Sequence, residues 1–131
     1  MNPQLQRDRI FQRLKHSLQA LALPDQQQAQ LFPTSVVVTN ELVLDFDHWQ
    51  SCTVGNYRTE LTESQLRSLT NLNDKIDNAD QSVWREDALG SHLFWIELRE
   101  LAIRALEAFG WPLAVPPSYK HEFVLGENAD R

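Results

Sequence analysis

The sequence predicts an α+β fold, in which three main helices pack against a small, mostly antiparallel sheet of two to four strands. Three segments carry apolar residues at helical spacing, whereas residues 35–46 are rich in β-branched and apolar residues. The 131 residues fit one domain with one core. We therefore expect a single compact domain over residues 1–125 and a disordered tail over residues 126–131.

The first helix is expected to begin with Asn2 as its cap and Pro3 as its first residue. Its apolar stripe repeats every three or four residues and consists of Ile10, Phe11, Leu14, Leu18 and Leu21. Arg9, Arg13 and His16 lie on the opposite face of that helix. Pro24 should end the helix, and residues 25–32 have the composition of one or two further helical turns.

Two strands are predicted next, over residues 35–38 and 41–46, joined by a tight turn at residues 39–41. One longer strand with a bulge at Asn40 is the alternative. Two weaker strand predictions are a short strand over residues 54–58 and an edge strand over residues 119–125. These segments would supply the two to four strands of the sheet.

The other two helices carry clearer end signals. Thr62 and Gln65 match a capping box, which predicts a helix from residue 63 to about residue 79. The longest apolar helical segment covers residues 88–109, and Gly110 is suited to end it. Residues 112–117 contain three prolines and should be extended.

The charge distribution restricts the classes of partner. The formal net charge of −6 argues against binding of nucleic acid, because phosphate backbones attract a basic surface. Residues 1–23 contain four basic residues and one acidic residue, a net charge of +3, which leaves −9 for the remainder. The N-terminal helix therefore either packs beside acidic neighbours or offers a basic face to a partner.

The same composition indicates a cytoplasmic protein that does not enter a membrane. No apolar run reaches the length of a membrane span, and the N-terminal helix lacks the continuous apolar core of a secretion signal. The one cysteine, Cys52, leaves no intrachain disulfide to form. A reducing compartment is the expectation that fits these features.

One candidate site consists of Asp45, Asp47 and His48, at the end of the predicted second strand. Side chains two residues apart on a strand point to the same side, so both carboxylates would face one cleft. Two carboxylates and an imidazole are able to hold a divalent metal that activates water. The alternative is that the aspartates only end the strand and cap turns.

A second candidate is an interaction surface. Trp84 and Trp111 flank the longest helix, Tyr119 follows the prolines, and Arg9 and Arg13 form the basic face. Aromatic side chains in such positions supply rigid contact area for a partner. We therefore expect a non-enzymatic protein-interaction module with an acidic surface, such as an adaptor, an inhibitor or immunity-type protein, or an accessory subunit. Its partner is another protein or a second copy, and a small metal-dependent hydrolase is the alternative function.

Overall fold

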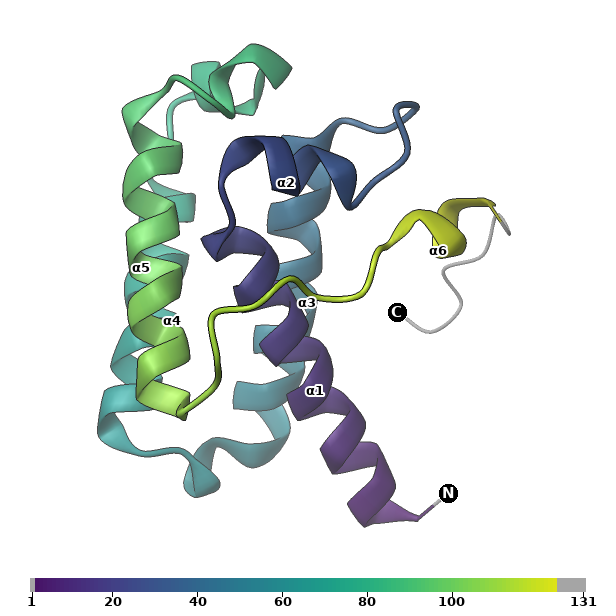
Figure 1. The fold of residues 1–131 in the computed structure, drawn as a ribbon. Coiled ribbons are helices and arrows are strands. Elements are labelled where there is room, and N and C mark those ends of the chain that lie inside the picture. The colour runs from purple at the N-terminus through teal and green to yellow at the C-terminus, as the bar shows by residue number, and fades with distance from the viewer. Residues whose placement is uncertain (1, 125–131) are drawn as a thin grey trace.

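Four long helices form the body of the protein, as the computed structural model of the chain shows for residues 2–124 (Figure 1). The long helices are α1 (Pro3–Ala22), α3 (Val38–Tyr57), α4 (Glu63–Asp77) and α5 (Leu93–Phe109). The short elements are α2 (Asp25–Gln30), α6 (Lys120–Val124), and the 3-10 turns η1 (Arg58–Glu60), η2 (Gln81–Trp84) and η3 (Glu86–Ala88). Helix α1 packs against both α3 and α5, while α4 packs mainly on α5 and touches α3 lightly. None of the helices described here is long and apolar enough to span a membrane.

The α+β prediction is wrong, because the part of the chain that the structure describes contains helices and no strand. The apolar stripes of the long helices meet in one core instead of covering a sheet. Trp95 is fully buried in that core, and its indole N–H donates a hydrogen bond of 2.8 Å to the carbonyl of Val83. Helix-on-helix packing therefore replaces the expected helix-on-sheet architecture.

The strands predicted over residues 35–38 and 41–46 are wrong, because α3 begins at Val38 and includes all of the second segment. The short strand predicted over residues 54–58 is also wrong, because α3 continues to Tyr57. The side chains that α3 buries are spaced every three or four residues and are Thr39, Leu42, Asp45, Phe46, Trp49, Gln50 and Thr53. This period is helical, and the β-branched composition concealed it. Tertiary burial of one helical face has overridden the strand propensity of the valines.

The predicted edge strand over residues 119–125 is also wrong, because Lys120–Val124 form helix α6. Residue 125 and the predicted disordered tail, residues 126–131, lie outside the described residues. Before α6, residues 111–118, here called the crossing segment, run without helix from the end of α5 (Figure 1). The crossing segment passes over α1 to the side of the molecule where α2 and α6 lie.

The local end signals of the helices are confirmed. Asn2 caps α1 by accepting a hydrogen bond of 2.9 Å from the backbone N–H of Gln4. Thr62 and Gln65 form the reciprocal capping box at the start of α4. Helix α5 begins at residue 93, five residues later than predicted, and ends at Gly110 with a φ of 71°. Each of these signals depends on a few neighbouring residues, so it survives a change of overall fold.

Arg99 of α5 joins three segments at one end of the bundle. Its guanidinium donates to the carbonyl of Leu23 at 3.0 Å, to the side-chain oxygen of Gln28 at 2.8 Å, and to the carbonyl of Leu89. Burial lowers the pKa of Arg99, and the nearby charge of Asp25 acts in the opposite direction. The bonds fix the end of α1, helix α2 and the residue after the η3 turn against α5.

Two glycines give opposite predictions for stability. Gly110→Ala should lower the free energy of unfolding by about 1 kcal/mol, because its positive φ is unfavourable for a residue with a side chain. Gly55→Ala should raise it by up to about 1 kcal/mol, because Gly55 lies inside α3 and an added Cβ meets no atom within 4 Å. Urea unfolding measures both changes, and equal effects of the two substitutions would contradict the described ends of α3 and α5.

Candidate functional site

Helix α3 has two faces with different chemistry, and both bear on function. Asp45 lies on the buried face and is only 2% exposed. Leu44, the residue before it, lies on the outer face and is 57% exposed. The buried face fixes the position of α3 and the C-terminal part of the chain, whereas the outer face is available to other molecules.

The buried carboxylate of Asp45 accepts hydrogen bonds from two aromatic side chains. The hydroxyl of Tyr119 donates to one oxygen at 2.9 Å, and the indole N–H of Trp49 donates to the other at 3.2 Å. A buried carboxylate is costly unless donors compensate for its lost hydration, so these bonds stabilise the charge where it lies. Trp49 is one helical turn from Asp45, but Tyr119 comes from a segment 74 residues away.

Tyr119 reaches Asp45 because the crossing segment is attached to the residues that follow α2. The backbone N–H of Tyr119 donates to the carbonyl of Leu31 at 2.8 Å, and the hydroxyl of Ser118 donates to the same carbonyl. The ring of Tyr119 stacks on Phe32, with centroids 4.8 Å apart. Burial raises the pKa of Tyr119 well above 10, and the charge of Asp45 and the hydrogen bond to it act in the same direction.

Helix α1 covers this cluster with two arginines. The guanidinium groups of Arg9 and Arg13 lie 5.8 Å and 5.4 Å from the ring centroid of Trp49, within the range of cation–π attraction. Arg13 also forms an ion pair of 2.7 Å with Glu122 of α6. Burial acts to lower the pKa of Arg13, but Glu122 and then Asp45 outweigh it and raise that pKa.

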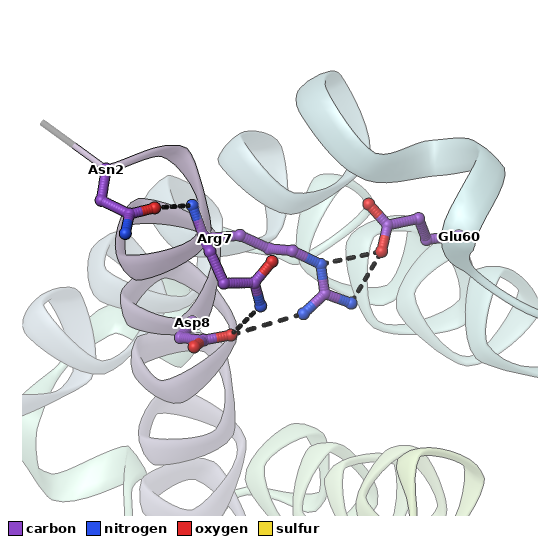
Figure 2. Close-up of polar contacts among 5 residues, drawn as sticks. Asn2, Arg7, Asp8 and Glu60 are labelled. Atoms are coloured by element: carbon purple, nitrogen blue, oxygen red, sulfur yellow. Dashed lines mark hydrogen bonds and ion pairs between the residues drawn. The ribbon is translucent and has the colours of Figure 1, made fainter.

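The first turns of α1 are fixed to the turn that follows α3. Figure 2 shows the guanidinium of Arg7 between two carboxylates, with Glu60 at 2.7 Å and Asp8 at 3.6 Å. The same view shows Asn2 capping the helix. These contacts are exposed, so each adds little stability, but together they restrict how the N-terminal turn of α1 is oriented.

The outer face of α3 forms one wall of a groove of about 220 Å³, lined by Asn40, Val43, Leu44 and Trp84 and here called the α3 groove. The ring of Trp84 packs edge-to-face against the rings of Phe94 and Trp95, with ring centroids 5.7 Å and 6.2 Å apart. The hydroxyl of Thr39 also donates to the backbone carbonyl of Trp84 at 2.7 Å. The tryptophan is therefore held in place from two sides and needs little ordering when another molecule contacts it.

Acidic side chains flank the α3 groove. Glu41 and Asp47 lie one helical turn on either side of Leu44, and so share its face of α3. Asp47 is exposed, and Glu41 is half-buried. Asp80, also exposed, directly precedes the η2 turn that carries Trp84. An apolar floor with an acidic border favours a ligand that combines apolar and basic side chains.

A second groove of about 360 Å³ lies on α1, here called the α1 groove, and is lined by Leu5, Asp8, Arg9, Gln12, Arg13, His16 and Pro117. Pro117 belongs to the crossing segment, so the end of that segment forms one wall. Burial lowers the pKa of His16, and the charges of Lys15 and Arg13 lower it further. The groove thus combines a histidine whose pKa is lowered with the charged side chains of Asp8, Arg9 and Arg13.

The structure brings Asp45, Arg9, Arg13 and Tyr119 together around Trp49, although the sequence assigned them to two separate sites. It separates Asp45 from Asp47, which is two residues further along a helix and therefore lies on the other side of it. Within the described residues, no three histidine, cysteine or acidic side chains are grouped so that they could hold a metal ion. The metal site predicted from Asp45, Asp47 and His48 therefore stays a prediction, and the described side chains do not converge into a set of metal ligands.

The remaining predicted residues lie elsewhere. His48 is half-buried, with its ring edge-on to Trp49 and its Nε2 atom 3.9 Å from the sulfur of Cys52. Trp111 stacks on Phe109 at a centroid distance of 4.4 Å. Trp84 belongs to the α3 groove, as described above. Leu44 is a surface residue that the sequence did not indicate, because a leucine in a predicted buried strand is expected to lie in the core.

Comparison with protein-family models, with curated proteins and with solved structures gave no match.

Removal of the Tyr119 hydroxyl should cost more stability than removal of the other tyrosine hydroxyl. Tyr119→Phe removes one hydrogen-bond donor from the buried carboxylate of Asp45, so the free energy of unfolding should fall by about 1–3 kcal/mol. Tyr57→Phe is the matched control, because that ring is half-buried against Phe11; its effect should stay within about 0.5 kcal/mol. Equal losses in urea unfolding would show that the bond to Asp45 has no special role.

The same bond predicts a loss of stability in alkali. Above pH 10 the unfolded tyrosine releases its proton, whereas the folded Tyr119 keeps it because its pKa is raised. The stability that depends on the protonated Tyr119 is therefore complete below pH 10 and declines above it. Relative to Tyr119→Phe, the wild type should lose an additional amount of about 1.4 kcal/mol per pH unit. The check is urea unfolding of both proteins between pH 9 and pH 11. A free energy of unfolding that falls equally with pH in the two proteins would contradict the prediction.

Proposed function

We propose that the protein is a non-enzymatic interaction module, of the adaptor, inhibitor or accessory-subunit type, whose α3 groove binds a basic amphipathic helix of a protein partner. The observation that carries the proposal is the pairing of Leu44 and Trp84 in one apolar groove. Leu44 is exposed although it is large and apolar, and Trp84 is held rigidly beside it. Rigid aromatic side chains next to an exposed aliphatic one are typical of the central contacts in protein interfaces.

A helix is the proposed form of the ligand because one wall of the groove is itself a helix. Amphipathic helices bind in such grooves through apolar side chains at positions i, i+4 and i+7, one or two of which enter the pocket. The volume of about 220 Å³ is that of a shallow groove for side chains, below the range usual for small-molecule sites. Side-chain anchoring of a larger molecule is therefore favoured over enclosure of a metabolite.

Charge supports a basic partner. The chain carries a net charge of −6, and Glu41, Asp47 and Asp80 lie around the apolar floor. Such a field accelerates encounter with a positively charged segment and disfavours an acidic one. It also disfavours the phosphate backbone of nucleic acids, which is the reason for proposing a protein ligand.

The direct test uses two fluorescein-labelled helical peptides of about 16 residues, which share leucines at positions i, i+4 and i+7. One peptide carries lysine and the other glutamate at the remaining positions. Fluorescence anisotropy should show that the protein binds the lysine peptide and not the glutamate peptide, and that added salt weakens binding. Equal affinity for both peptides, or for neither, would contradict the proposal.

The location of binding is tested with two leucine variants of similar exposure. Leu44→Lys should weaken binding of the lysine peptide by about tenfold or more, because it removes an apolar anchor and repels the peptide. Leu113→Lys, at a 59% exposed leucine of the crossing segment, makes the same chemical change elsewhere and should alter affinity less than about twofold. In NMR spectra, the indole N–H signal of Trp84 should shift on binding while that of the buried Trp49 stays.

A further inference from the structure

We infer that His92 is a pH-sensitive switch at the start of α5, whose neutral imidazole holds the first turn of that helix and, through it, the rigid position of Trp84. Protonation of the ring releases both. The inference rests on the proposed function, because it concerns the regulation of the α3 groove. The N-cap of α5 is an imidazole nitrogen, whereas most helices are capped by a hydroxyl, carboxylate or amide oxygen.

The cap of α5 requires an uncharged ring. The backbone N–H of Phe94 donates a hydrogen bond of 3.1 Å to Nδ1 of His92. A ring nitrogen accepts such a bond through its lone pair, which the imidazolium lacks because both of its nitrogens carry hydrogen. Protonation therefore sets two N–H groups against each other, and it adds a positive charge at the positive end of the helix dipole. The stabilisation from the cap is present at neutral pH and is lost as the pH falls and the ring gains a proton.

The loss of this cap affects one turn of the helix. Without the ring nitrogen, the N–H of Phe94 has to reach water, so the first turn opens. Leu93 is 62% exposed and adds no burial that would hold the turn closed. The backbone carbonyl of His92 accepts a hydrogen bond of 3.0 Å from the N–H of Trp95, and this bond does not involve the ring. The opening is therefore confined to residues 93 and 94.

Phe94 connects the cap to the α3 groove. Its side chain is 6% exposed, and its ring packs edge-to-face against the ring of Trp84. The bond from Thr39 to the carbonyl of Trp84 holds the backbone of the η2 turn but not the indole ring. When Phe94 loosens, the ring of Trp84 loses one of its aromatic supports and becomes less ordered. A less ordered side chain loses more entropy on binding, so the affinity of the α3 groove falls.

The charges that face His92 act on the ring in opposite directions. Lys75 of α4, Asp80 before η2 and Glu97 of α5 line the same cavity of about 270 Å³ as His92. Lys75 and Glu97 form an ion pair, and the carboxylate of Asp80 attracts the imidazolium that Lys75 repels. Imidazoles as a class change charge between pH 5 and pH 8. The other charged residues of this region lie beside the preceding loop or within the turn before it, and are Asp25, Arg85, Glu86, Asp87 and Arg99.

The test compares the wild type with two variants that fix the state of the cap. His92→Asn supplies an amide oxygen, a good N-cap acceptor that does not titrate, and His92→Ala removes the acceptor. NMR at pH 7.5 and pH 5.5 measures the protection of the Phe94 amide from hydrogen exchange, relative to its intrinsic rate at each pH. The wild type should match His92→Asn at pH 7.5 and His92→Ala at pH 5.5, a loss of protection of about fivefold.

His121→Asn is the matched control, because His121 is an exposed histidine of α6, far along the chain from the cap. This variant should keep the pH response of the wild type. The inference is overturned if protection of the Phe94 amide in the wild type is the same at both pH values, or if His92→Asn responds to pH as the wild type does.

The effect on the α3 groove is measured with the lysine peptide described above. The wild type and His92→Asn should bind it equally at pH 7.5, and the wild type should bind about threefold or more weakly than His92→Asn at pH 5.5. All other groups that titrate in this range are present in both proteins, so their comparison isolates His92. Equal affinities at pH 5.5 would reject the regulation of the groove by His92. If neither protein binds the peptide at pH 7.5, the proposed function fails, whereas the exchange measurement still decides whether His92 switches the start of α5.

Discussion

The hydrogen bond between the hydroxyl of Tyr119 and the buried carboxylate of Asp45 is the interaction on which the arrangement of the chain depends. A carboxylate in the interior needs donors, and the helix that contains Asp45 supplies one of them, the indole N–H of Trp49. Another donor, the hydroxyl of Tyr119, comes from a distant part of the chain. The chain brings it by the crossing segment, which is attached at Leu31 and then continues into α6. The C-terminal part of the molecule is therefore built around one buried charge of α3.

This arrangement also explains why α3 has a free outer face. Its inner face is occupied by the core and by the Asp45 cluster, and α4 touches α3 only lightly because it packs mainly on α5. The η2 turn, held by Thr39 and by the aromatic rings of α5, fills part of the space beside α3 and leaves the α3 groove open. A four-helix body in which all neighbours packed equally would have buried Leu44.

The helix ends could be predicted from the sequence, whereas the fold class could not. Asn2, Thr62 with Gln65, and Gly110 act on their immediate neighbours, so their meaning does not depend on what the helix packs against. The region of residues 35–46 is different, because its valines favour a strand locally while Leu42 and Phe46 fit a helical stripe. Only the contact with α1 decides between these, and that contact joins distant parts of the sequence.

The candidate sites show the same division. Arg9, Arg13 and Tyr119 were identified individually as interaction residues, and Asp45 as a metal ligand, but nothing local indicates that they meet at Trp49. The sequence places Trp84 beside the long α5 segment, but the strand prediction for residues 41–46 hides its partner Leu44 in the α3 groove. Sequence patterns thus supplied the chemistry of single residues, and tertiary packing determined which of them act together.

The crossing segment has a consequence for the order in which the protein folds during its synthesis. Asp45 leaves the ribosome 74 residues before Tyr119, so the rest of α3 and all of α4 and α5 are synthesised before the hydroxyl of Tyr119 is present. Over that interval the carboxylate of Asp45 lacks the hydrogen bond from the hydroxyl of Tyr119, and an under-compensated buried charge is costly. The packing of this buried carboxylate is therefore completed only after the four long helices have been synthesised, because its partner Tyr119 follows all of them in the chain.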